Sequence, residues 1–155
     1  MPNPPFSQNW SSASLITAND DWSGVPGIQG FLGQDITTTT GADPRTLLGT
    51  SSAQNDLDVI ANQSNPNTLT SGGVAEFDGI ANPTIALNGS ATADAPYIVI
   101  NLDTTGLSNV KVSYNLRDLD ASADNAAQQV ALHYRVGNSG SYVNLPDGYV
   151  ADATE

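Results

Sequence analysis

Residues 117–125, which read Arg-Asp-Leu-Asp-Ala-Ser-Ala-Asp-Asn, hold the densest group of potential metal ligands in the sequence. In proteins, Ca²⁺ binds about six to eight oxygen atoms from carboxylates, side-chain amides and backbone carbonyls. The stretch is not an EF-hand, because Ala123 stands where that loop needs glycine and Gln129 stands where it needs a bidentate glutamate. It predicts a calcium site of another kind or, alternatively, a turn capped by its own carboxylates or paired with a nearby arginine. The expected ligands are Asp118, Asp120, Asp124 and Asn125.

Two further acidic groups are formed by Asp20 with Asp21 and by Asp56 with Asp58. Carboxylates this close repel one another, by an amount that depends on how well solvent screens them. A bound cation, an arginine or the solvent itself would relieve the repulsion. We therefore predict Asp20 and Asp21 as a second candidate calcium site and the 56–58 pair as a third, with solvated loop acids as the alternative.

The aromatic residues offer a different chemistry, since an exposed ring can stack on a sugar. Trp22 follows an acidic loop and is the best candidate for carbohydrate binding, and Tyr142, beside a predicted turn, is the second. The amphipathic rings of tryptophan and tyrosine also suit the edge of a core. Core packing is therefore the alternative for both residues.

The sequence lacks the residue types for nucleophilic or thiolate chemistry. It has no cysteine, and its single histidine, His133, lies in the middle of a predicted strand on the more polar face. We expect this histidine to be solvated and not part of a Ser-His-Asp triad. Paired aspartates can hydrolyse glycosides, but an acid with a raised pKa usually needs an apolar pocket. The sequence predicts no catalytic centre, with a hydrolase using paired aspartates as the remaining enzymatic alternative.

The charge balance limits the partners that the chain can bind. Sixteen acidic residues oppose four basic ones, for a net charge of -12. Nucleic-acid affinity rests on cations that neutralise phosphates, so no nucleic-acid partner is expected, and anionic membrane surfaces are disfavoured for the same reason. No stretch approaches the roughly 20 apolar residues of a membrane span. Divalent cations are the natural partners of such a surface.

The elements that would position these residues are short strands separated by turns. Fourteen of the acids are aspartate, and Glu and Lys, which suit surface helices, are rare. Apolar and polar residues alternate in the clearest strand candidates, and Gly137–Gly140 predicts a hairpin turn. The chain is expected to be one all-β domain over residues 1–155, a two-sheet β-sandwich of jelly-roll type. The strand candidates are 15–16, 28–32, 36–40, 57–60, 84–87, 97–102, 110–116, 130–136 and 142–145.

Several stretches together resemble the N-terminal accessory β-sandwich module of large secreted bacterial nucleases, phosphoesterases and related multidomain surface proteins. The resemblance covers nearly the whole chain and implies an accessory jelly roll whose catalytic domain lies elsewhere in the polypeptide. The start of the sequence, residues 1–6, has no features of a leader peptide, so we expect either a cytosolic protein or one whose leader was removed. The composition favours the second, a secreted or cell-surface location, which agrees with the resemblance. The resemblance assigns no catalytic residues. The stretches that carry it are 6–10, 15–24, 56–63, 72–77, 114–120, 123–125 and 132–137.

In that family the module continues through further strands beyond the segment matching 151–154. The resemblance therefore implies a sandwich that lacks its last strands as written and exposes an open sheet edge. A neighbouring chain could supply the missing strand and so build a homo-oligomer or filament. Simple truncation or proteolysis is the alternative.

These observations leave hypotheses of different classes. The first is a non-catalytic extracellular binding module, stabilised by calcium, with carbohydrate or matrix polymer as its ligand. The second is a structural, self-assembling surface subunit completed by a neighbour's strand. The third is a hydrolase, or a module of a hydrolase whose catalytic domain is absent from this chain.

Overall fold

The computed structural model describes residues 5–34, 36–39, 41–48, 56–120 and 127–154, and within these ranges it contains β-strands, short 3-10 helices and no α-helix. The all-β class is therefore confirmed, and within these ranges no helix has the length and apolar character needed to cross a membrane. The named elements are β1 (Ile28–Phe31), η1 (Pro44–Thr46), η3 (Pro66–Thr68), β2 (Gly73–Phe77), β3 (Thr84–Asn88), β4 (Tyr97–Ile100), β5 (Val130–Tyr134) and β6 (Val143–Val150).

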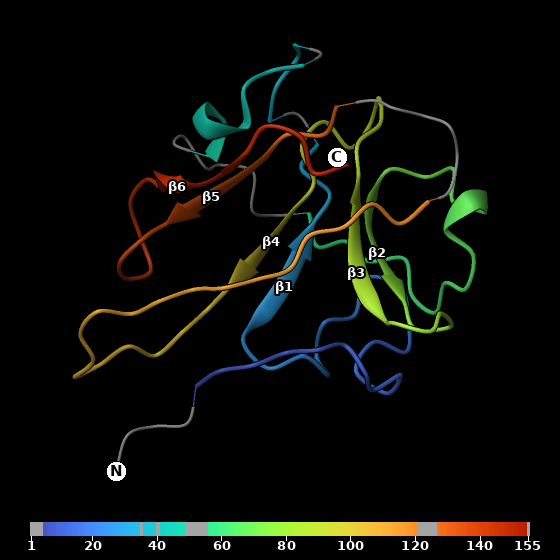
Figure 1. The fold of residues 1–155 in the computed structure, drawn as a ribbon, viewed down its shortest axis with the longest axis horizontal. Helices are drawn as coiled ribbons and strands as arrows, with labels where there is room; N and C mark the ends of the chain where they lie inside the picture. Colours follow the sequence, from blue (N-terminus) through green and yellow to red (C-terminus); the bar gives the residue numbers. More distant parts are fainter. Residues whose placement is uncertain (1–4, 35, 40, 49–55, 121–126, 155) are drawn as a thin grey trace.

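The strands form three antiparallel pairs, β1 with β4, β2 with β3, and β5 with β6 (Figure 1). The segment 56–63 connects the first two pairs. Its first part hydrogen-bonds to β1, with Asp58 N donating to Gly30 O, and its second part runs parallel to β2, with Ile60 N donating to Val74 O at 2.8 Å. The backbone order is therefore β4, β1, segment 56–63, β2 and β3, whereas the arrangement of two stacked sheets stays a prediction.

The core lies around this central segment and β2. Every residue of β2 is buried, including Glu76, which is 2% exposed. A strand has this pattern when other parts of the chain cover both of its faces, because its side chains point alternately to one face and the other. The buried cluster consists of Ile16, Trp22, Val25, Ile28, Val59, Ala61 and Val74.

The β5–β6 hairpin follows the sequence prediction. Leu132 pairs with Leu145 and His133 with Asn144, with a register irregularity between Val130 and Leu132. The hairpin packs against η1, whose first residue is Pro44, as expected for a residue that fixes the opening turn of a helix.

The prediction of a half-buried strand at 110–116 is wrong. The alternation of apolar and polar residues predicted a strand with one face buried, but this segment pairs with no other strand in the described part of the chain and is exposed along its length. Residues 36–39 of the candidate 36–40 also lie outside any strand. Segment 110–116 is therefore an exposed stretch of alternating apolar and polar residues.

Candidate functional site

The chain between β4 and β5 forms a long arm, which we define as residues 101–118. Figure 1 shows it leaving the end of β4 in yellow, turning far from the strands and returning in orange across the front of the molecule. Its first residue is fixed by Asn101 N, which donates to Gly27 O at 2.7 Å, and its turn is closed by Leu107 N, which donates to Thr104 O at 2.9 Å.

The returning half of the arm has no backbone partner among the described residues. In the described ranges no backbone–backbone hydrogen bond involves residues 108–118. Two side chains attach this half to the rest of the molecule: the Tyr114 hydroxyl donates to Gly148 O of β6 at 3.1 Å, and the Arg117 guanidinium donates to Asn82 O. The backbone N–H and C=O groups between these attachments are available to another strand.

The apolar side chains of this half are exposed instead of packed. Val110, Val112, Tyr114 and Leu116 are 43–52% exposed. Because successive side chains in an extended chain point to opposite faces, these four belong to one face and Lys111, Ser113, Asn115 and Arg117 to the other. An alternating apolar face on an unpaired edge is the pattern of a surface that accepts a strand.

The arm is close to neutral in an acidic chain. Residues 104–117 contain Lys111 and Arg117, two of the four basic residues, and are flanked by Asp103 and Asp118, whereas the chain as a whole carries a net charge of -12. More exposed apolar side chains lie on the β5–β6 hairpin, to which Tyr114 attaches the arm. They are those of Tyr134, Val136, Val143 and Leu145.

The predicted calcium loop is only partly within the described residues. Asp118 and Asp120 are exposed at its start, while Asp124 and Asn125 lie outside the described ranges. The described residues contain no group of three or more carboxylates, histidines or cysteines placed to hold a metal ion. Calcium binding at 118–125 therefore stays a prediction.

The second candidate calcium pair has structural partners instead. The Asp20 carboxylate accepts a hydrogen bond from Val59 N at 3.2 Å, and the Asp21 carboxylate accepts one from Ser23 N at 2.9 Å. The hydrogen bonds with Ser23 lower the pKa of Asp21. Asp20 has a positive φ of 60°, which Asp tolerates better than most residues, and this conformation aims its carboxylate at the neighbouring segment.

Asp58 fixes the central segment to β2. Its carboxylate accepts a hydrogen bond from Val74 N at 2.5 Å. Burial raises the pKa of Asp58, the Val74 N–H acts in the opposite direction, and the nearby Asp20 and Asp56 carboxylates add to the rise. Asp58 thus orders the junction between segment 56–63 and β2, a role that the spacing of the carboxylates at 56 and 58 did not reveal.

The two aromatic candidates for carbohydrate binding lie in different surroundings. Trp22 is 5% exposed and packs in the core, where its Nε1 donates to Asp58 O at 3.0 Å and its ring meets Trp10 edge to face. Trp22 therefore has no open face for a sugar, which corrects its prediction as a ligand-binding residue. Tyr142 is half-buried, and the Arg135 guanidinium lies over its ring at 4.5 Å from the centroid.

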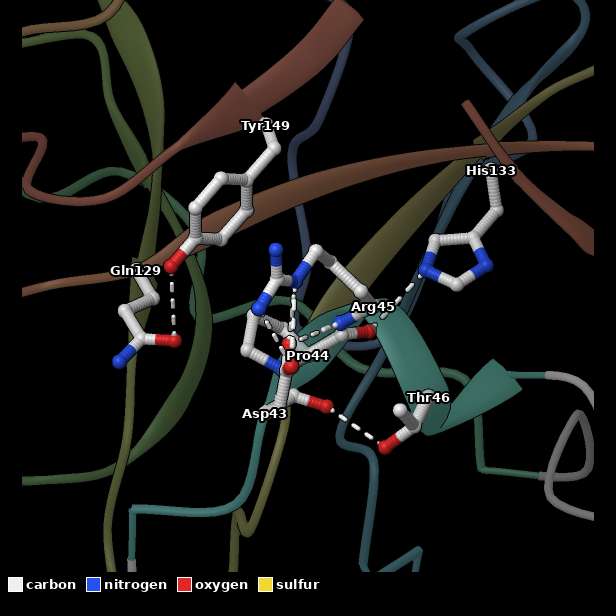
Figure 2. A network of polar contacts seen from close by, with 7 residues as sticks. All are labelled: Asp43, Pro44, Arg45, Thr46, Gln129, His133 and Tyr149. Atoms are coloured by element: carbon white, nitrogen blue, oxygen red, sulfur yellow. Dashed lines mark hydrogen bonds and ion pairs between the residues drawn. The ribbon is translucent and has the colours of Figure 1, made fainter. Parts of the chain in front are cut away.

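His133 is also more enclosed than the sequence predicts. Its Nε2 lies 3.0 Å from Pro44 O, while its Nδ1 is buried and has no hydrogen-bond partner in the part of the chain that the structure describes. Figure 2 shows this contact beside the Arg45 guanidinium, which pairs with Asp43 at 2.7 Å and covers the Tyr149 ring. Together these contacts hold η1 against the hairpin.

Comparison with known proteins returned no matching family model, no matching curated protein and no matching solved structure. The resemblance to accessory modules of secreted nucleases and phosphoesterases is therefore a prediction that these comparisons do not test.

Proposed function

We propose that this chain is a non-catalytic, extracellular β-sandwich module that binds a polypeptide partner by adding the partner's strand to segment 110–116. The observation that carries the proposal is the combination of an unpaired backbone with four exposed apolar side chains on one face. Main-chain hydrogen bonds supply affinity in such complexes, and the alternating side chains supply specificity. This choice favours the assembly hypothesis over carbohydrate binding, whose best candidate, Trp22, is buried.

The apolar face alone would argue for a protein partner. Isolated apolar side chains are common on protein surfaces, but a row along one strand edge is a known aggregation hazard that folded proteins usually cover. Here the row continues towards the β5–β6 hairpin, because Tyr114 reaches β6. The partner strand would therefore form backbone hydrogen bonds with segment 110–116 and pack its own apolar side chains beside this row.

The test uses the whole chain, immobilised sparsely, as the target for a phage-displayed library of random peptides. We expect enrichment of peptides in which apolar residues alternate with polar ones. The enriched peptide is then titrated, with a fluorescent label, against the wild type and two variants. Val112→Asp should weaken binding at least about tenfold by placing a charge on the apolar face, whereas Phe6→Asp, at a residue 50% exposed outside both the arm and the β5–β6 hairpin, should leave binding unchanged.

Hydrogen exchange gives an independent result on the same surface. The amides of 110–116 should exchange quickly in the free monomer and slowly with the peptide bound, since backbone hydrogen bonds protect amides. Slow exchange of these amides in the free monomer would overturn the proposal, because it would show that the segment is already paired. So would equal binding of the peptide by wild type and Val112→Asp.

A further inference from the structure

Segment 110–116 is complementary to itself when two copies run antiparallel. With Ser113 opposite its own counterpart, Val110 faces Leu116, Val112 faces Tyr114, and Lys111 faces Asn115. Directly opposed residues in an antiparallel pair lie on the same face of the sheet. All apolar side chains of both copies then share one face, and no like charges stand directly opposite each other.

The neighbouring registers are less favourable. Centring the pair on Tyr114 places Lys111 opposite Arg117, which is a like-charge pair. It also places Asp118 opposite Val110, on the apolar face. Centring it on Val112 places Leu116 opposite Ser108. Shifts by an odd number of residues bring the apolar face of one copy against the polar face of the other. The sequence of the segment therefore selects the register centred on Ser113.

In the register centred on Ser113, the charges of the segment do not oppose pairing with a second copy. Segment 110–116 carries one charged residue, Lys111, which faces Asn115 of the other copy. The contact is isologous, as expected of a two-fold dimer. The overall charge of -12 on each copy acts against association at low ionic strength, where screening is weak.

We propose that the chain forms a two-fold symmetric dimer by antiparallel pairing of segment 110–116 with the same segment of a second copy, in register about Ser113. This inference rests on the proposed function and names its partner. The dissociation constant of the dimer should fall as salt rises from low to physiological concentration. Screening reduces the repulsion between the two copies, each with a net charge of -12, more than it affects backbone hydrogen bonds.

The absence of cysteine allows a sharp test, since any introduced thiol is the only one in the chain. In the Ser113→Cys variant the two thiols oppose each other across the dimer axis, within the Cα separation that a disulfide needs. In the control Asn115→Cys, on the same exposed face, the thiols lie four residues apart along the strands, about 13 Å, which is too far to bridge. Mild oxidation should therefore trap a disulfide dimer of Ser113→Cys and leave Asn115→Cys largely monomeric.

Light scattering on the wild type over a concentration series should show a shift from monomer to dimer that Val112→Asp removes. A wild type that stays monomeric at every concentration, or equal cross-linking of the two cysteine variants, would overturn the dimer. If peptide binding to the arm persists in that case, the strand-addition function stands and only the identity of the partner is wrong. If the arm amides are protected in the monomer, both proposals fail.

Discussion

The Asp58 carboxylate accepts a hydrogen bond from Val74 N at 2.5 Å, and it thereby joins segment 56–63 to β2, whose residues are all buried. The contact also depends on Gly73, the residue before Val74 in the chain. Gly73 has a φ of +117°, and a Cβ at this position would lie 2.2 Å from the Asp58 Oδ2 atom. The backbone conformation and the close approach both require glycine here.

Replacement of Gly73 by alanine should therefore destabilise the fold through two effects. The left-handed conformation costs a residue with a Cβ about 1–2 kcal/mol, and displacement of the carboxylate leaves Val74 N without its acceptor. We expect Gly73→Ala to lower the free energy of unfolding by about 3 kcal/mol in urea denaturation. The control is Gly106→Ala, since Gly106 has a φ of +74° with open space around it. Its cost should be the conformational part alone, and equal losses in the two variants would contradict the role given to Asp58.

The buried Glu76 predicts a particular pH dependence. Burial raises its pKa, a hydrogen bond from Asn62 N acts in the opposite direction, and the Asp78 carboxylate adds to the rise. Between the unfolded and folded pKa values the folded state binds more protons, so stability falls as pH rises through this window. Glu76→Gln keeps an oxygen that can accept from Asn62 N but cannot titrate. Its unfolding free energy should therefore fall less than that of the wild type from about pH 4 to about pH 7.

The comparison with Glu76→Gln isolates one carboxyl group from the others. Asp58, whose pKa burial also raises, contributes the same slope to both proteins, and Asp43 and Asp152, whose pKa values hydrogen bonds lower, contribute an opposite slope to both. Urea unfolding at a series of pH values measures the difference directly. Parallel stability curves for wild type and variant would show that Glu76 has the same proton affinity in the folded and unfolded states.

The burial of Trp22 can be checked by fluorescence and by mutation. The chain has two tryptophans, so Trp10→Phe leaves Trp22 as the only one, and acrylamide should quench its emission weakly. Trp22→Phe removes the Nε1–H donor to Asp58 O and leaves a cavity, for an expected loss of about 2–3 kcal/mol in urea denaturation. Strong quenching, or a neutral Trp22→Phe variant, would show that this side chain is exposed.

The β5–β6 hairpin and the arm show what alternation in a sequence can predict. Both have apolar residues at every second position, and Gly137–Gly140 further indicates a turn that brings β5 and β6 together. Alternation identifies the apolar face of a strand, but it does not show whether a partner strand exists. The segment 110–116 therefore seemed equivalent to β5 although it is unpaired.

Burial set by distant residues was harder to predict. Trp22 follows two aspartates and has the local features of a loop, and its enclosure depends on Asp58, 36 residues later. Glu76 interrupts an apolar run, so β2 was not among the predicted strands, and its carboxylate is accommodated by Asn62 N from another segment. The proposed site could be predicted as an alternating segment from the sequence, whereas its exposure required the structure.

Two buried atoms on opposed residues predict a stabilising substitution. His133 and Asn144 pair across β5 and β6, and His133 Nδ1 and Asn144 Oδ1 both lack a hydrogen-bond partner among the described residues. A buried carbonyl oxygen without a partner costs about 1–3 kcal/mol, and valine suits a strand better than asparagine. Asn144→Val should therefore raise the free energy of unfolding by about 1 kcal/mol. A loss of stability in urea denaturation would show that the Asn144 amide has a partner, such as a bound water.

The predicted calcium site is tested by comparing two acidic regions. If calcium binds only the folded chain, saturating calcium raises the melting temperature, because such a ligand shifts the folding equilibrium. We expect this rise in the wild type and its loss in the double variant Asp118→Asn, Asp120→Asn. In the control Asp20→Asn the amide oxygen can still accept from Val59 N, so the rise should persist. An unchanged melting temperature of the wild type with calcium and with chelator would show that the folded chain does not bind calcium.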